Sequence, residues 1–301
     1  MASSGIGGQA VMEGVMMRKD HVYAVAVRKP DQTIVVDKKT VKSIGNDSLR
    51  KIPIIRGVVS FVDSLVLGMS TLAYSASFFE EEEPDGGEAG EKKEKLMMGG
   101  TIALSIVLAL ALFTALPFYL SLLFQKFIHS QTVIILLEGL IRLVIFFAYL
   151  LAISRMKDIQ RVFMYHGAEH KSINCIEHGM DLTVENVRSS SRMHKRCGTS
   201  FLFFVVIISI IVTLFIRVDS RLLRLVLRLA VIPIVAGISY EWIRLAGTSE
   251  NPIVNALSKP GLLMQRLTTR EPDDDMIEVA IASVEAVFDW KAYLKEEWGR
   301  A

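Results

Sequence analysis

The sequence predicts a mainly α-helical membrane protein: a polytopic bundle of four spans with a small N-terminal β region and amphipathic helices. Three observations lead to this fold class. Hydrophobic residues make up 51% of the 301-residue chain and charged residues only 22%, which is too little charge to cover a soluble surface. The mean hydropathy is +0.39. The apolar residues are also clustered into runs long enough to cross a bilayer.

Composition also excludes several classes of protein. Two cysteines are too few for a small domain built on disulfides, and the hydrophobic content is too high for a disordered chain. A formal net charge of +2 is too small to indicate a nucleic acid as partner. We therefore expect the lipid bilayer as the main partner, and no nucleic acid.

Residues 1–51 are expected to form a cytoplasmic β-rich region. Three strand-like runs follow one another in it: Ala10–Met17, Val22–Val27 and Thr33–Val36. They are separated by Lys19-Asp20 and by the turn signal Pro30-Asp31. Their spacing predicts a small β-meander.

Residues 52–79 are expected to form an amphipathic helix. Its apolar residues lie on one face at about 100° per residue, and Arg56, Asp63 and several serines lie on the opposite face. Such a helix lies in the membrane interface or packs against other helices rather than crossing lipid. The acidic, glycine-rich residues 80–96 are expected to be a flexible linker.

Residues 97–246 are expected to form the membrane domain. Its four predicted spans are Met97–Phe124, Thr132–Ile153, Thr199–Ile216 and Leu222–Ala246. The first span contains Pro117, which is compatible with a tilt or a kink. The last span carries Arg224 and Arg228 near one end, where long side chains reach the membrane interface.

The distribution of Lys and Arg predicts the orientation of the spans. Residues 1–96 hold 13 of these side chains and the central loop 154–198 holds eight, whereas the connections 125–131 and 217–221 hold one and two. The positive-inside rule then places both termini and the central loop in the cytoplasm of a multi-pass cell-membrane protein. A fifth span at 52–79 would push the central loop outside.

The last region, 247–301, is expected to be a cytoplasmic segment with one helix over Pro272–Trp298. Pro272 followed by three aspartates is a helix-start pattern, because carboxylates suit the positive end of the helix dipole. The apolar stripe of this helix consists of Ile277, Ile281, Val284 and Phe288. We expect the helix to dock on the β region or on a protein partner at the cytoplasmic face.

The central loop concentrates the residues that bind metals. It holds both cysteines and four of the six histidines: Cys175, Cys197, His166, His170, His178 and His194. His166 to His170 reads H-x-x-E-H, and on a helix two imidazoles four residues apart point at one ion with Glu169 beside them. In inverted zinc peptidases the two histidines of this pattern hold zinc and the glutamate activates water.

The remaining ligands of such a zinc site must come from elsewhere. His194 and Cys197, just before the third predicted span, are the best candidates, and Glu241 is a further one. Glu177 lies about 10 Å further along the helix, too far to join the two histidines at one ion. Three protein ligands leave a position for water, as in a catalytic site, and four close a structural site. Both interpretations are open, as is a nucleophilic Cys197 paired with a histidine.

Glu138 and Arg142 lie four residues apart inside the second predicted span. The structural interpretation is a pair that faces the bundle interior and neutralises itself. The functional interpretation is a polar track for an ion or a substrate, with Glu241 as a further member.

Four motifs occur together in this chain. They are Gly8–Arg18, Tyr165–Lys171, Arg196–Ser200 and Thr268–Pro272 with the helix that follows it. In combination they resemble the YqhQ family, bacterial multi-pass membrane proteins of undetermined function described as predicted metal-dependent enzymes. The resemblance implies a membrane location and a metal site at His166, Glu169 and His170. The acidic stretch Glu80–Glu91 has no counterpart in that pattern.

Three functional hypotheses follow. In the first, zinc at the cytoplasmic membrane face and Glu169 as general base form a metal-dependent hydrolase that acts on a peptide or a lipid-linked substrate. In the second, the chain is a non-enzymatic scaffold or assembly factor with a structural metal or none. In the third, it is a transporter or channel that uses Glu138, Arg142 and Glu241. The sequence leaves substrate and oligomeric state open.

Overall fold

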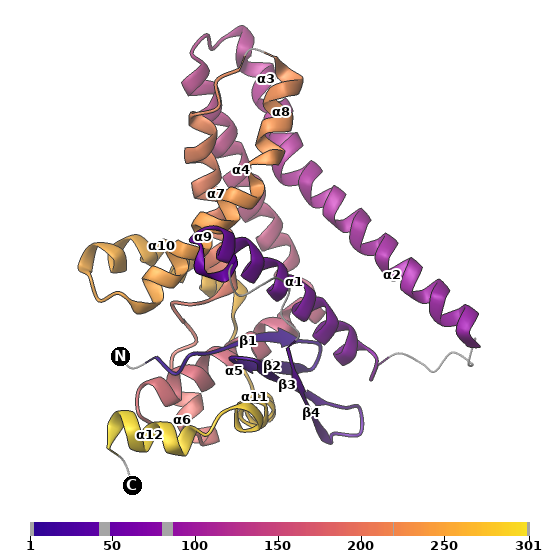
Figure 1. The fold of residues 1–301 in the computed structure, drawn as a ribbon, viewed down its shortest axis with the longest axis vertical. Coiled ribbons are helices and arrows are strands. Elements are labelled where there is room, and N and C mark those ends of the chain that lie inside the picture. The colour runs from indigo at the N-terminus through magenta and orange to yellow at the C-terminus, as the bar shows by residue number, and fades with distance from the viewer. Residues whose placement is uncertain (1–2, 42–48, 80–86, 219, 300–301) are drawn as a thin grey trace. The chain divides into compact units, whose positions relative to one another are not determined.

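The computed structural model describes residues 3–41, 49–79, 87–218 and 220–299, with the side chains of all of these except 87–96, 98 and 221. The chain forms two compact units (Figure 1). Unit 1 comprises Met1–Phe79, Leu150–Phe204 and Ala236–Ala301, and unit 2 comprises Glu80–Tyr149 and Val205–Val235.

Unit 1 contains an antiparallel sheet of four strands in the order β1-β2-β3-β4. The strands are β1 (Ile6–Val11), β2 (Gly14–Lys19), β3 (Val22–Arg28) and β4 (Ile34–Thr40). This arrangement is the meander that the sequence predicts. The single strand predicted over Ala10–Met17 is wrong, because the chain reverses there and pairs Val11 with Gly14. Glu13 takes a positive φ of 48° in this turn, and neither Met12 nor Glu13 is a residue typical of hairpin turns.

Two helices pack on the sheet and enclose the main core of unit 1. They are α5 (Lys157–Glu177) and α11 (Asp274–Val287), with the short α6 (Val184–Ser189) beside them. Ile277 and Val284 of the predicted apolar stripe are fully buried in this core. The C-terminal helix therefore docks on the β region. It is two helices rather than one, because Asp289 caps a separate α12 (Trp290–Trp298) by accepting from Ala292 N at 3.0 Å.

The polar face of α1 (Ile55–Ala76), which follows the short 3-10 helix η1 (Leu49–Lys51), packs against protein. Its buried residues are Gly57, Asp63, Gly68, Thr71 and Ser75. Ser75 Oγ accepts from Met12 N at 3.1 Å, and the Gln9 side chain lies against Gly68. At Gly57 the helix approaches Gly237 of α9 (Ile232–Thr248) so closely that a Cβ would lie 2.8 Å from the Gly237 oxygen. The exposed side of α1 is apolar.

The regular elements of unit 2 in the described residues are all helical. Its chain runs through α2 (Gly87–Leu110), the π-helical turn η2 (Ala111–Ala115), α3 (Leu116–Leu123) and the 3-10 turn η3 (Phe124–Lys126), and then includes most of α4 (Gln131–Ile153), the second part of α7 (Gly198–Leu214) and all of α8 (Arg221–Ala230). The π-helical turn precedes Pro117, which has no N–H to donate and so disturbs the regular hydrogen-bond ladder. The linker expected over 80–96 differs from the structure, since α2 begins at Gly87; residues 80–86 lie outside the described chain.

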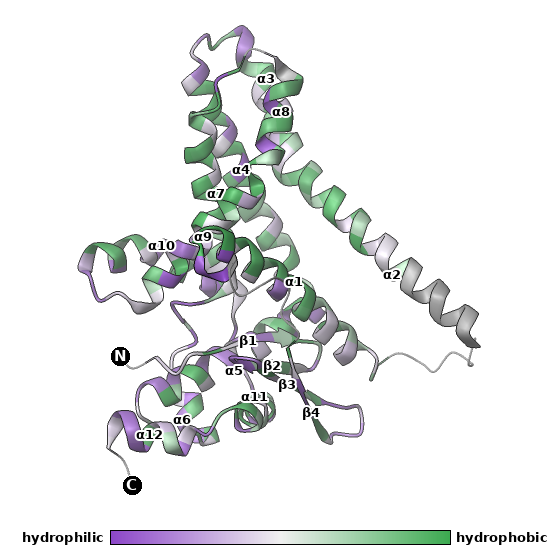
Figure 2. Cartoon of the chain, in the orientation of Figure 1, coloured by the Kyte–Doolittle hydropathy of each residue, from purple (hydrophilic) through white to green (hydrophobic). Residues whose placement is uncertain are grey.

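Four helical segments are long and apolar enough to cross a membrane. They are Ile55–Ala76, Gly99–Lys126, Gln131–Ile153 and Leu222–Thr248. The sequence also predicts four spans, but the two sets differ by one member. Helix α1 is long and apolar enough although no span is predicted there, whereas α7 (Gly198–Leu214), at the third predicted span, has only 17 residues. Helix α7 ends before the stretch Arg217–Ser220, where Ser220 caps the start of α8. Figure 2 shows that α3, α4 and α7 are predominantly hydrophobic.

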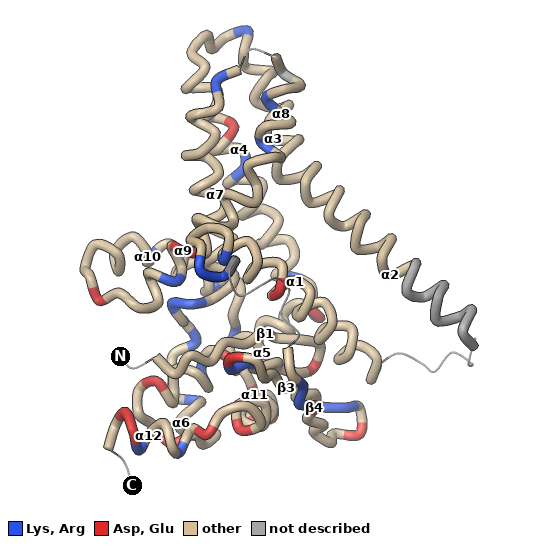
Figure 3. Tube along the Cα trace, viewed as in Figure 1, with Lys and Arg blue, Asp and Glu red and all other residues tan. Residues whose placement is uncertain are grey.

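Charged residues are distributed unevenly over the elements. Figure 3 shows them frequently on α5, α6, α11 and α12 and rarely along α3, α4 and α7.

One further helix of unit 1, α10 (Pro252–Thr268), is absent from the sequence prediction. Its N-cap is Asn251, whose side chain accepts from Ile253 N at 2.8 Å. The end of α10 leads directly to the site described next.

Candidate metal centre

Helix α5 carries the H-x-x-E-H motif. From Tyr165 onward most of its residues are buried, so the motif faces the interior of unit 1. Gly167 marks a close approach, because a Cβ on it would lie 2.0 Å from the backbone oxygen of Arg270. The segment after α10 therefore crosses α5 at the motif, which only a glycine permits at this point.

The two histidines of the motif are oriented by backbone carbonyls. His166 Nδ1 lies 2.8 Å from Thr268 O, and His170 Nδ1 lies 2.6 Å from Arg192 O. Because a carbonyl oxygen only accepts hydrogen bonds, each Nδ1 carries its proton and donates. The Nε2 atom of each neutral ring then has the free lone pair that a metal ion needs. The ring centroids are 4.4 Å apart.

Cys197 completes a cluster with these two rings. Its Sγ lies 3.3 Å from His166 Nε2 and is also approached by Thr199, with the backbone N at 3.4 Å and Oγ1 at 3.1 Å. Ligand atoms of His166, His170 and Cys197 all lie within 4.8 Å of one another. In a tetrahedral zinc site, nitrogen and sulfur ligands are separated by roughly 3.3–3.6 Å. The cluster is therefore close to the size of a metal site.

The electrostatics of the cluster favour a thiolate. Burial alone would raise the pKa of Cys197, but the fields of His166 and His170 outweigh it and hold the pKa of the thiol well below its usual value. Burial alone would lower the pKa of His166, but the neighbouring Cys197 outweighs it and raises the pKa to about 9. His166 Nε2 and Cys197 Sγ therefore share one proton, and a cation that binds between them displaces this proton.

Glu169 is buried beside the cluster. Burial, the largest effect, raises the pKa of its carboxyl group, while His170 and His166 act in the opposite direction. Gly8, in strand β1, lies against the side chain of Glu169. Gly8 must be small, because a Cβ on it would lie 2.9 Å from Glu169 Cγ. The N-terminal strand thus forms one wall of the site.

His194, an expected ligand, lies elsewhere. Its Nε2 is 3.3 Å from Glu177 Oε2, and its ring centroid is 5.8 Å from that of His170. Gln265 holds its backbone, accepting from His194 N at 2.8 Å and donating to His194 O at 2.7 Å. Glu177 also accepts from Ser4 and Arg196. His194, Glu177 and Arg196 therefore form a hydrogen-bonded network next to the cluster of three.

The acidic residues of the predicted spans are ion-paired. In unit 2, Glu138 accepts from Arg142 at 2.9 Å and also contacts Arg228, and all three side chains are buried. In unit 1, Glu241 accepts from Arg56 Nε at 2.6 Å, so it is bound outside the metal cluster. The transport hypothesis requires these carboxylates to line a hydrated path, and carboxylates held in ion pairs do not support it.

Sequence reasoning missed three contributors to the site: Gly8 and the carbonyl groups of Thr268 and Arg192. The first and second lie in motifs that the sequence analysis singled out, Gly8–Arg18 and Thr268–Pro272, without giving them a role. Arg192 carries no such signal. Carbonyl groups are present in every residue, so only the fold shows which of them reach a histidine.

Comparison with known proteins identifies the family. DUF1385, a family of proteins of unknown function, matches residues 52–290. The chain belongs to this family. It is also 38% identical over 287 residues to the uncharacterized protein YqhQ of Bacillus subtilis (strain 168), which covers 92% of this chain and 90% of the relative. The resemblance drawn from the motifs is thereby confirmed. No solved structure matches this DUF1385 member.

Proposed function

We propose that His166, His170 and Cys197 hold a zinc ion at which the chain performs hydrolysis. The observation that carries the proposal is the fixed direction of both histidine rings, whose Nδ1 atoms donate to Thr268 O and Arg192 O while ligand atoms of the three residues converge within 4.8 Å. Two imidazole nitrogens and one thiolate form a donor set that zinc accepts. Carbonyl groups that orient such histidines are typical of zinc sites.

Three protein ligands leave a fourth position for a substrate or a water molecule. Bound zinc supplies Lewis-acid chemistry, which polarises a carbonyl or phosphoryl group and makes water acidic near neutral pH. Glu169, on the same helix, acts as the general base that takes a proton from the attacking water. Gly8 lies against its side chain, and burial raises the pKa of its carboxyl group.

One observation favours a second function, a scaffold with a structural metal. His170 is only 1% exposed and Cys197 only 4% exposed, so a ligand at the site has little access to solvent. In this alternative the metal only holds α5 and the segment of Cys197 together and has no catalytic role. The charged helices α11 and α12 then recruit a protein partner.

The experiment measures bound zinc and hydrolysis in wild type, Glu169→Gln, His170→Ala and His178→Ala. His178 directly follows the last residue of the same helix, with its Nδ1 on Asn174 O, outside the cluster, and serves as the matched control. The hydrolase predicts that Glu169→Gln keeps its zinc and loses activity, whereas His170→Ala loses both. The scaffold predicts that Glu169→Gln keeps its function in the cell, whereas His170→Ala loses function because the protein becomes unstable. Wild-type protein without stoichiometric zinc rejects both.

We also propose that both termini and residues 154–198 face the cytoplasm. The support is the charge asymmetry of the loops, 13 and eight Lys and Arg against one and two. Reporter fusions at residues 128, 180 and 301 test this orientation. Alkaline phosphatase active at 180 or 301, or green fluorescence at 128, contradicts it.

A further inference from the structure

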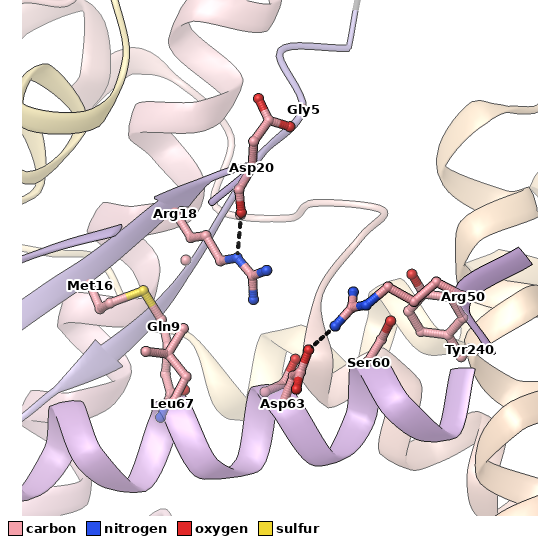
Figure 4. Close-up of a pocket in the computed structure, with 13 residues that line it drawn as sticks. Gly5, Gln9, Met16, Arg18, Asp20, Arg50, Ser60, Asp63, Leu67 and Tyr240 are labelled. Carbon is pink, nitrogen blue, oxygen red and sulfur yellow. Dashed lines mark hydrogen bonds and ion pairs between the residues drawn. The ribbon is translucent and has the colours of Figure 1, made fainter. Parts of the chain in front are cut away.

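A pocket of about 400 Å³ lies against strand β1 (Figure 4). It is bounded by β1, β2, η1 and α1, with Tyr240 of α9 at one end. Neighbouring residues of a strand point to opposite faces, so Gly8 faces Glu169 while Gly7 faces the pocket. No atom lies within 4 Å of the place where a Cβ on Gly7 would stand. The pocket is thus open space beside the strand.

Arg18 presents an unused cationic group to this pocket. Its Nε donates to Asp20 O at 2.9 Å, and among the described residues its two terminal nitrogens have no hydrogen-bond partner. Figure 4 shows these nitrogens directed into the gap toward α1, with the Asp20 carboxylate turned away from them. A guanidinium group presents its N–H groups as a fork that matches two oxygens of an oxyanion.

Helix α1 presents hydroxyl groups to the same pocket. Ser60 and Ser64 are one turn apart and both line it. Neither hydroxyl bonds to another described residue, whereas Thr71 and Ser75 of the same helix donate to carbonyls three residues earlier. Asp63, which lies between the two serines, is ion-paired with Arg50. Its negative charge is therefore balanced within the protein.

We propose that this pocket binds a phosphate group, with Arg18 holding two of its oxygens and Ser60 and Ser64 donating to the others. A guanidinium fork and two hydroxyls supply more donors than the two oxygens of a carboxylate require, which favours phosphate. The phosphate belongs to a soluble ester or to a lipid headgroup. Both sources share the same chemistry, and the site does not depend on the metal centre.

The test is calorimetric titration of the full-length protein in non-ionic detergent and phosphate-free buffer. The probes are glycerol 3-phosphate, dihexanoyl phosphatidylglycerol and, as the ligand without phosphate, glycerol. Arg18→Gln weakens binding at least about tenfold, because a charge-assisted pair of hydrogen bonds is lost. Arg266→Gln, which removes an exposed arginine of α10 outside the pocket, leaves binding unchanged.

A second variant tests the site without changing any charge. Gly7→Leu places a side chain in the open space of the pocket and abolishes binding while the protein keeps its melting temperature and its zinc. Binding of only one of the two phosphate probes supports the site and shows whether the phosphate group comes from a soluble ester or from a lipid headgroup. Wild-type protein that binds neither probe overturns the proposal, as do Arg18→Gln or Gly7→Leu proteins that bind like wild type.

Discussion

The cluster of His166, His170 and Cys197 and the cluster of Glu138, Arg142 and Arg228 both lie largely inside the protein, but their polar atoms have different partners. In the arginine cluster, the single carboxylate of Glu138 contacts both guanidinium groups, and Arg228 also lies 4.7 Å over the Phe118 ring. In the histidine cluster, the outer nitrogens bind neutral carbonyls and the inner atoms face each other. Paired charges hold helices together, whereas groups oriented by neutral partners are free to bind a ligand.

The largest expected effect comes from breaking the arginine cluster. Glu138→Gln leaves two buried guanidinium groups without their counter-charge and lowers the free energy of unfolding by about 3–5 kcal/mol. Chemical or thermal unfolding in detergent, followed by tryptophan fluorescence, measures this loss. Glu241→Gln, at the partly exposed pair with Arg56, serves as the control and costs about 1 kcal/mol or less. Equal losses in the two variants contradict a structural role for Glu138.

The second prediction concerns the two cysteines, which form a matched pair of buried thiols. Cys197→Ser lowers the affinity for zinc at least about a hundredfold, since a thiolate ligand is lost. Cys175→Ser leaves zinc affinity unchanged, because Cys175 Sγ donates to Asp181 O at 3.3 Å, away from the cluster. Competition with a chromogenic chelator measures both affinities. A Cys197→Ser protein that binds zinc like wild type refutes the metal centre.

The smallest effect is expected at Glu177, which supports the centre without belonging to it. Burial alone would raise its pKa, but the hydrogen bond from His194 and the charge of Arg196 lower it to about 2. A lowered pKa in the folded state stabilises the protein above the unfolded value of ~4.3, and this stability is lost as pH falls toward 2. Glu177→Gln is therefore about 2–3 kcal/mol less stable than wild type at pH 7.

The pH dependence separates this effect from simple damage to packing. The stability difference between wild type and Glu177→Gln shrinks as the pH falls from 5 to 3, because Glu177 takes up a proton in the unfolded protein over this range while it stays ionised in the folded protein. Melting temperatures over that range measure it. A difference that stays constant with pH shows that the charge of Glu177 does not contribute.

Local sequence patterns were sufficient to predict those features that depend on the periodicity of residues along a single helix or strand. The meander and the buried stripe with Ile277 and Val284 follow from periodicity, as does the common face of His166 and His170 on α5. The turn at Glu13 has no typical turn residue and was missed. The clear polar face of α1 predicts that the helix lies in the membrane interface or packs against other helices, but the sequence alone does not decide between these two, and in the structure the polar face packs on protein.

The candidate site was less predictable, because its residues come from distant parts of the chain. His194 and Cys197 lie three residues apart in a segment without helical periodicity, so spacing does not show which of them turns toward His166. In the structure Cys197 does, and His194 binds Glu177. The contacts of Gly8 and Thr268 join residues more than a hundred positions from the motif, which no local pattern reveals.

The contact between His166 and Thr268 also sets an order of events during synthesis. The partner of His166 is made 102 residues after it, and unit 1 is assembled from three separate stretches of chain. The histidine ring cannot be fixed while the ribosome is still translating α10. The proposed zinc site therefore lacks its final geometry until α10 has been made, and before that point His166 and His170 form a less ordered pair of ligands.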